Sequence, residues 1–245
     1  MSPNTIVMWF VPNQAGFEIM GLTKVALVTA SSAGLGAATA KGLARAGFSI
    51  VINYNSNKQK AETVVHDINQ IYTQRNIPPL DSSQDAPHSI AIKADMSQKS
   101  EIGQLVQQVI DQYGRLDCVV SNQGWTEMRR FEDLDDNMEE DDWDRCYNMN
   151  VKSHLFLFHA AKPYLTTTNG SFTTIASLAG VIPSGSSIVC LSTHLPIYIL
   201  ITQHQKIQTK NVLPKNNFPS KLALNPSANH RIKSHTPSPK QHKST

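Results

Sequence analysis

Residues 188–245 contain no Asp, no Glu and no Gly, although they hold eight of the 22 Lys and Arg residues and six of the 13 prolines. Residues 1–187 carry all 19 acidic residues, so that part of the chain is net acidic. A Pro, Ser, Asn and Lys-rich segment buries little apolar surface. We therefore expect residues 190–245 to form a basic, disordered tail, with binding to nucleic acid or an anionic membrane as the alternative.

Other absences exclude further classes of protein. The three cysteines, Cys118, Cys146 and Cys190, have no paired spacing, so neither a disulfide framework nor a metal site is expected. The apolar run at residues 6–11 is too short to span a bilayer and has no basic residue before it. We interpret residues 1–21 as an N-terminal extension, with a targeting peptide as the alternative, and expect a cytoplasmic protein.

From Lys24 onwards, short apolar runs alternate with segments of helical periodicity, which is typical of βαβ units on a parallel sheet. The fold class predicted is α/β, with a doubly wound parallel sheet (Rossmann fold) over residues 22–189 that is incomplete at its C-terminal side. Such sheets bind ligands at the carboxyl ends of their strands. The expected strands are 24–29, 48–54, 88–95, 115–122 and 170–177, and the expected helices are 37–47, 60–72, 97–114 and 150–165.

The helix expected at 97–114 shows the clearest amphipathic pattern. Its apolar residues fall on one helical face, which should be buried. Ser97 or Ser100 is the candidate N-cap and Gly114 the stop signal. The residues of the apolar face are Ile102, Leu105, Val106, Val109, Ile110 and Tyr113.

The stretch Thr29-Ala30-Ser31-Ser32-Ala33-Gly34-Leu35-Gly36 connects the first strand to the first helix. Glycines at such a turn let the backbone approach a phosphate, and the free N–H groups of the helix N-terminus favour an anion. Small residues at a tight turn can also be purely structural. With a strand before it and a helix after it, the stretch favours nucleotide binding.

This loop resembles the TGxxxGxG fingerprint of the short-chain dehydrogenase/reductase family, and further motifs follow in the family's order. Ser121-Asn122-Gln123-Gly124 resembles its NNAG motif, Asn150 in NVK its catalytic asparagine, and Ser177 in IASLAG its catalytic serine. The resemblance implies catalytic roles for Ser177 and Asn150. It implies cofactor binding by Thr29, Ser31, Ser32, Gly34, Leu35, Gly36, Asn53, Asp95, Met96, Asn122 and Gly124, with Asp95 at the adenine.

Three positions depart from the family's pattern. Ala30 replaces the first glycine of the fingerprint and adds a Cβ where the turn normally has none. Ser121 and Gln123 replace an asparagine and an alanine of the second motif. The first change could weaken cofactor binding, whereas none of the three argues against the fold.

The end of the second strand bears on the choice of cofactor. The residues there are Asn53-Tyr54-Asn55-Ser56-Asn57-Lys58, with no acidic side chain to bind the ribose hydroxyls and repel a 2′-phosphate. The sequence therefore favours NADP over NAD, although Lys58 could simply be a solvated charge.

The resemblance also implies a catalytic tyrosine and lysine, one helical turn apart as YxxxK, in which the lysine lowers the pKa of the tyrosine. The family's spacing from Ser177 places them at positions 190 and 194, where this chain has Cys190 and His194. A thiol is too short to replace the phenol, and a histidine lacks the permanent charge of lysine. The alternative, a Cys190–His194 nucleophile pair or metal site, lacks an identifiable third group.

The changed composition after Val189 suggests that the chain continues into unrelated sequence, for example through a retained intron or a faulty gene model, which sequencing of the transcript would decide. We predict an NAD(P)-dependent oxidoreductase acting on a small carbonyl or secondary alcohol, inactive in this form. Neither a membrane nor a nucleic acid is an expected partner. The family often forms homo-oligomers, but the helix that builds the dimer is missing here. The alternatives are a non-catalytic nucleotide-binding protein and a basic-tail interaction protein.

Overall fold

The computed structural model describes residues 24–75, 87–177, 187–190 and 192–193. All of them belong to one compact unit, Met1–Gln205. The expected extension at 1–21 lies outside the described residues, as does the expected tail apart from residues 190, 192 and 193.

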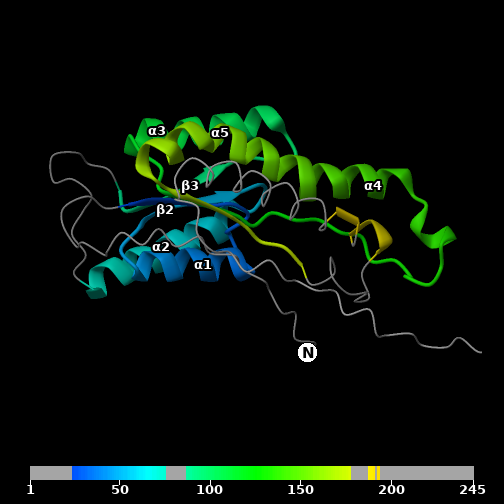
Figure 1. The fold of residues 1–245 in the computed structure, drawn as a ribbon. Coiled ribbons are helices and arrows are strands. Elements are labelled where there is room, and N and C mark those ends of the chain that lie inside the picture. Colours follow the sequence, from blue (N-terminus) through cyan, green and yellow to red (C-terminus); the bar gives the residue numbers. More distant parts are fainter. Residues whose placement is uncertain (1–23, 76–86, 178–186, 191, 194–245) are drawn as a thin grey trace, which may run out of the picture. The chain divides into compact units, whose positions relative to one another are not determined.

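The described residues form a parallel sheet of five strands, which confirms the predicted α/β class. The strand order is β3-β2-β1-β4-β5, and every paired neighbour runs parallel (Figure 1). β1, β2 and β4 are buried along their whole length, as expected of central strands covered on both faces. The strands are β1 (Val25–Val28), β2 (Ser49–Tyr54), β3 (Ser89–Lys93), β4 (Cys118–Ser121) and β5 (Ser171–Thr174).

Helices cover both faces of the sheet. α1 (Gly34–Arg45) and α2 (Lys58–Arg75) pack together on one face, and α3 (Lys99–Tyr113) and α5 (Ser153–Thr168) pack together on the other (Figure 1). Between β4 and α5 the chain forms a short 3₁₀ turn η1 (Asp135–Asn137), helix α4 (Glu140–Tyr147) and a π-helical turn η2 (Asn148–Lys152). None of the described helices is both long and apolar enough to cross a membrane.

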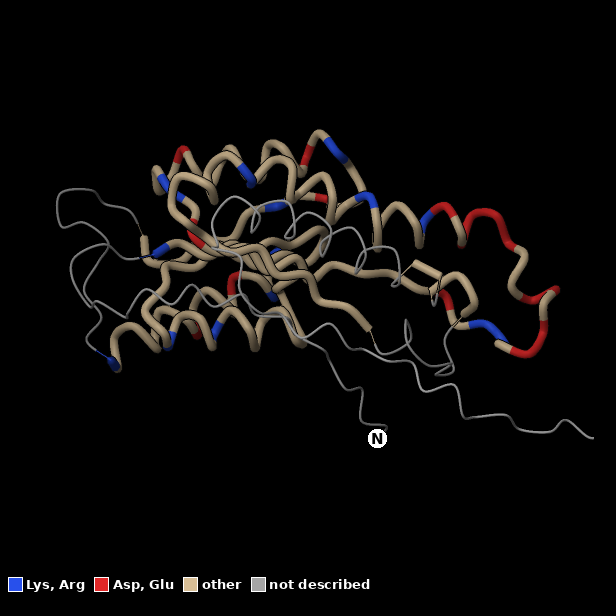
Figure 2. Tube along the Cα trace, viewed as in Figure 1, with Lys and Arg blue, Asp and Glu red and all other residues tan. Residues whose placement is uncertain are grey.

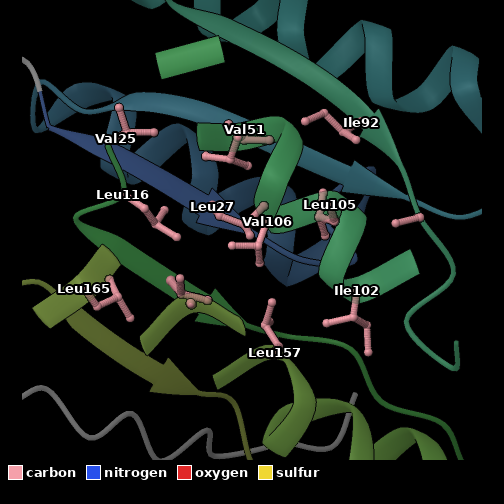
Figure 3. Packing of buried hydrophobic residues seen from close by; sticks show 14 of the residues in the cluster. Val25, Leu27, Val51, Ile92, Ile102, Leu105, Val106, Leu116, Leu157 and Leu165 are labelled. Atoms are coloured by element: carbon pink, nitrogen blue, oxygen red, sulfur yellow. The ribbon is translucent and has the colours of Figure 1, made fainter. Parts of the chain in front are cut away.

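The core has two halves, one on each face of the sheet. Val25 and Leu27 of β1 point into the half under α3 and α5, whereas Ala26 and Val28 point into the half under α1 and α2. This alternation follows from the two-residue period of a strand. Figure 3 shows the first half, in which Leu27, Val106 and Leu157 come from a strand and two different helices.

Helix α3 follows the predicted pattern at its buried face and its end. Five of the six residues expected on the apolar face are buried and Ile110 is partly buried, while Gly114 ends the helix with a left-handed φ of 67°. The N-cap is Gln98, so the expectation of Ser97 or Ser100 was wrong. Asp95 fixes the preceding turn instead, since its Oδ1 accepts a hydrogen bond from Ser97 N at 2.8 Å.

A buried carboxylate holds the start of β4 against β1. Asp117 is 6% exposed, and its Oδ2 accepts hydrogen bonds from Val25 N at 2.9 Å and Arg115 Nε at 2.8 Å. A second Arg115 nitrogen donates to Asp117 Oδ1 at 2.6 Å, and this hydrogen bonding raises the pKa of Arg115. The paired carboxylate therefore fixes the amino-terminal edge of the central strands.

Candidate functional site

The loops after β1 and β4 meet at the carboxyl edge of the sheet. β1 lies between β2 and β4, so the chain leaves β1 towards one side of the sheet and later returns to its other side. In doubly wound folds this switch point is where a ligand binds. The residues predicted for the cofactor gather around it.

The loop after β1 is joined to β4 through Thr29 and Asn122. Thr29 is completely buried, its N donates to Val120 O at 3.0 Å, and its Oγ1 accepts a hydrogen bond from Asn122 N at 2.9 Å. Asn122 Nδ2 donates to the carbonyl oxygens of Thr29 and Ala30, each at 3.2 Å. The second predicted motif thus fixes the position of the first.

Asn53 at the end of β2 supports the same loop from the other side. Its Oδ1 accepts a hydrogen bond from Ala30 N at 3.0 Å, and its Nδ2 donates to Ala94 O at 3.0 Å. Asn53 is 1% exposed, and Ser31 N donates to Asn53 O at 2.9 Å. Any contribution of Asn53 to cofactor binding would therefore act through the shape of the loop.

The two fingerprint glycines have different roles. Gly34 begins α1 with a left-handed φ of 57°, and a Cβ added there would meet no described atom within 4 Å. Gly36 is buried, and an added Cβ would lie 2.6 Å from Ala30 O and 2.7 Å from Asn122 Nδ2. Gly34 leaves open space beside the helix N-terminus, whereas Gly36 lets the helix pack against both loops.

The N-terminus of α1 is suited to an anion. Ala33 is the N-cap, and its side chain makes no capping hydrogen bond. The first N–H groups of a helix have no partner within the helix and carry its positive dipole end. Ser32 is partly exposed and Leu35 is 36% exposed, so these predicted residues lie at the surface, whereas Ser31 is buried and donates to Val28 O at 2.6 Å.

Ala30 adopts a left-handed φ of 47°, which an L-residue with a Cβ rarely does. We expect Ala30→Gly to raise the free energy of unfolding by about 0.5–1 kcal/mol, because relief of the left-handed strain exceeds the entropy that glycine gains in the unfolded chain. Urea unfolding of both proteins measures this difference. Gly42→Ala, in the exposed middle of α1, is the opposite change and should also stabilise, since Gly42 has no left-handed φ. An Ala30→Gly protein less stable than the wild type would contradict the strain argument.

Asp95 and Met96 follow β3 at the same edge. Asp95 is partly exposed, so its carboxylate can contact a ligand while it still accepts the hydrogen bond from Ser97 N. Met96 is 4% exposed and packs in the core with α3, so only its backbone is available for a cofactor.

The predicted catalytic Asn150 lies in the π turn η2 and is 2% exposed. Its Oδ1 accepts a hydrogen bond from Trp125 N at 2.8 Å, and its Nδ2 donates to Trp125 O at 2.9 Å. Nδ2 also contacts Cys146 Sγ at 3.0 Å and Thr193 Oγ1 at 3.1 Å. Asn150 therefore holds the loop that begins at Gly124, and π turns of this kind occur often at functional sites.

Ser177 is exposed and follows β5 by three residues, at the same carboxyl edge. Cys190, where the family's spacing predicts the tyrosine, is 5% exposed and packs with Cys146, Val189 and Trp125. Burial raises the pKa of the Cys146 thiol, which disfavours a reactive thiolate in this cluster. His194 lies outside the described residues, and the described residues contain no group of three metal-ligating side chains.

The charged residues are unevenly distributed around this edge. Figure 2 shows Asp and Glu concentrated around η1 and the start of α4, where Arg129 pairs with Asp142 at 2.8 Å. The loop after β1 carries no charged residue, and Lys58 begins α2 just beyond β2. The fingerprint loop therefore has no negative side chain that would repel a bound phosphate.

Gln123 and His154 are site residues to which the sequence analysis gave no role. Gln123 is 4% exposed and His154 is 5% exposed, and both join a buried group of polar side chains behind the loop after β1. The departure from alanine at position 123 was visible in the sequence. The partners of Gln123 on α5, Ser153 and His154, could not be identified from the sequence.

The profile of the short chain dehydrogenase family matches residues 24–190. The chain belongs to the short-chain dehydrogenase/reductase family. It is 35% identical to the hydroxynaphthalene reductase-like protein Arp2 of Metarhizium guizhouense over 162 residues, which are 66% of this chain and 53% of that protein. It is 30% identical to the 3-oxoacyl-acyl-carrier-protein reductase FabG of Staphylococcus aureus over 164 residues, or 66% of this chain and 59% of that protein. The chain thus spans about half the length of the Metarhizium relatives.

Solved structures show the same fold. Acetoin dehydrogenase from Enterobacter cloacae is 25% identical with a TM-score of 0.64, covering 78% of this chain and 72% of that one. An alcohol dehydrogenase from Thermococcus sibiricus, complexed with 5-hydroxy-NADP, is 22% identical with a TM-score of 0.63, covering 76% and 72%. These similarities agree with the Rossmann fold of the short-chain dehydrogenase/reductase family, whose members use NAD(P).

Proposed function

We propose that this chain is the nucleotide-binding part of a short-chain oxidoreductase and binds NADP(H) at the carboxyl edge of β1 and β4. The observation that carries the proposal is the uncapped N-terminus of α1, with open space at Gly34 and a loop fixed between Asn53 and Asn122. A pyrophosphate would accept hydrogen bonds from the first N–H groups of α1. Asp95 and Gly124 lie on loops at the same edge, where the adenosine and nicotinamide ends would contact the protein.

The reaction to which this part of the fold belongs is transfer of a hydride between the nicotinamide and a small carbonyl or secondary alcohol, which a chain with the family's full catalytic set would complete. The dinucleotide supplies or accepts the hydride when bound. Ser177 would hydrogen-bond the substrate oxygen, since it is exposed and lies three residues after β5 at the carboxyl edge. Asn150 would hold the loop of Trp125 beside the substrate, through its two hydrogen bonds to that residue.

The preference for NADP is supported by the end of β2. The side chain of Asn53 is already engaged, and Asn55, Ser56 and Asn57 are exposed and neutral. The Lys58 side chain is 72% exposed and its Nζ lies 3.4 Å from Glu62 Oε1, an exposed pair that costs little to break. Lys58 could therefore turn towards a 2′-phosphate.

We also propose that this chain does not turn over substrate. A proton must reach or leave the substrate oxygen through a group within hydrogen-bond reach. Cys190 replaces the family's tyrosine, and its buried position against Cys146 and Val189 keeps it in an apolar cluster. A small-molecule carbonyl or alcohol substrate and a cytoplasmic location are proposed from the family alone.

The test is binding and turnover with the purified full chain. We expect NADPH to bind about tenfold more tightly than NADH, a difference of about 1.4 kcal/mol, because Lys58 can pair with the 2′-phosphate that only NADPH carries. Titration of nucleotide fluorescence measures both affinities. Oxidation of NADPH with a panel of ketones should not exceed the rate without protein. Ordinary enzymatic turnover would contradict the inactivity, tighter NADH binding would contradict the cofactor preference, and failure to bind either nucleotide would contradict the proposed function.

A further inference from the structure

Gln123 follows the end of β4, at a position where the family's motif has alanine, and its side chain is 4% exposed. A buried primary amide has two N–H donors and one carbonyl oxygen to satisfy. The Gln123 amide meets this requirement with hydroxyl groups from three different elements. It therefore connects parts of the site that are far apart in the sequence.

On one side Gln123 contacts the loop after β1. The hydroxyl of Thr29 donates a hydrogen bond to Gln123 Oε1, and Thr29 Oγ1 in turn accepts one from Asn122 N at 2.9 Å. Thr29 is the first residue of the fingerprint and is completely buried. The position of the loop is thus coupled to the side chain of Gln123.

On the other side Gln123 contacts the first residue of α5. Its Nε2 donates to Ser153 Oγ at 2.8 Å, and the Ser153 hydroxyl donates to Met149 O in the π turn η2. Met149 directly precedes Asn150 in the chain. Gln123 therefore connects the predicted nucleotide loop and the turn of the predicted catalytic asparagine through one amide.

The second N–H of Gln123 Nε2 donates to Ser121 Oγ at 3.1 Å. Ser121 Oγ lies 2.6 Å from His154 Nδ1, so the serine hydroxyl can donate to that ring nitrogen. With this orientation, both amide protons and the amide oxygen of Gln123 are used. Ser121 and Gln123, the two departures from the family's second motif, thus belong to one hydrogen-bonded group.

We propose that Gln123 is a positioning residue that sets the distance between the nucleotide loop and the asparagine turn, and so determines affinity for the pyrophosphate and nicotinamide half of the dinucleotide. This inference rests on the proposed function, because it requires the dinucleotide to occupy the loop after β1. The adenosine half would lie towards β2 and β3, where Gln123 makes no described contact. Loss of the amide should therefore affect the two halves differently.

The experiment compares NADPH with 2′,5′-ADP, the adenosine fragment of NADP, as ligands of the wild type and of Gln123→Met. Methionine has nearly the length of glutamine but none of its hydrogen bonds. We expect about a tenfold loss of affinity for NADPH, corresponding to one or two lost buried hydrogen bonds, and less than about a twofold change for 2′,5′-ADP. A residue that only supports folding would leave both affinities unchanged or lower them together.

Ser153→Ala is the second variant and removes the link from Gln123 through the Ser153 hydroxyl to Met149 O of η2. We expect it to weaken NADPH binding by about threefold, again without a change for 2′,5′-ADP. Ser49→Ala is the matched control, because Ser49 is buried at the opposite end of β2 and its hydroxyl has no hydrogen-bond partner among the described residues. Urea unfolding of each variant confirms that the protein measured is folded.

Unchanged NADPH affinity in folded Gln123→Met and Ser153→Ala would overturn this inference while leaving the proposed function standing. Equal losses for both ligands would also overturn it. A wild-type chain that binds neither ligand would overturn the proposed function and, with it, the inference. The two failures are therefore distinguishable in one set of titrations.

Discussion

Replacing Gly36 with alanine is expected to lower the free energy of unfolding by about 3 kcal/mol and to weaken NADPH binding at least about tenfold. The added Cβ would lie 2.6 Å from Ala30 O and 2.8 Å from Ser31 Cα, both of which are backbone atoms. It would also lie 2.7 Å from Asn122 Nδ2. Helix α1 would have to move away from the loop, and the N–H groups proposed to bind the pyrophosphate would move with it. Urea unfolding and nucleotide titration measure the two effects.

Gly42→Ala in the same helix is the matched control. An added Cβ at Gly42 would meet no described atom within 4 Å. The change should stabilise the helix by about 0.5–1 kcal/mol and leave nucleotide affinity unchanged. If Gly36→Ala unfolded at the same urea concentration as the wild type, the close packing of α1 on the two loops would be wrong.

Asp117→Ala is expected to lower the free energy of unfolding by about 4 kcal/mol. Asp117 is nearly fully buried, and its loss would leave Arg115 without its carboxylate and Val25 N without its acceptor. The buried Val25 N–H left without a partner would cost more than the hydrogen bond contributed, and the Arg115 side chain, which is 24% exposed, would lose its pair as well. Chemical unfolding followed by circular dichroism measures the change.

Two comparisons make this result interpretable. Asp117→Asn keeps an oxygen that can accept from Val25 N and removes only the charge, so it should cost about 2 kcal/mol. Asp67→Ala removes a partly exposed pair with Lys41, whose side chains are 38% and 30% exposed, and should cost less than about 1 kcal/mol. Similar losses for Asp117→Ala and Asp67→Ala would show that the buried Asp117 carboxylate does not anchor β4.

The sheet and the first loop could be predicted because their signals are local and repeated. β1 is a continuous apolar run and β2 and β4 contain shorter ones, which is the pattern of strands buried on both faces. The apolar face of α3 and its stop at Gly114 were equally plain. The periodicity of apolar residues and a glycine that ends a helix are both properties of a short stretch of sequence. Predicting these elements therefore needed no knowledge of tertiary contacts.

The support of the site could not be predicted in the same way. The amide of Asn53 is chemically suited to a ribose or to a neighbouring backbone, and only the approach of Ala30 N and Ala94 O decides between them. Gln123 finds its partners at Thr29 and Ser153, 94 and 30 residues away. Such pairings depend on how the strands are ordered in space, which the sequence pattern does not contain.

The π turn at Asn148–Lys152 constrains the length of the chain around it. A turn of this kind holds about one more residue than an α-helical turn, and each residue of an α-helix advances by about 100°. Deleting one residue here would make the helix regular but rotate α4 against α5. Cys146 on one side and Leu157 on the other, both fully buried, could then not both keep their places. Substitutions in this segment leave the rotation between α4 and α5 unchanged. An insertion or deletion would change that rotation and displace a buried residue of one helix or the other.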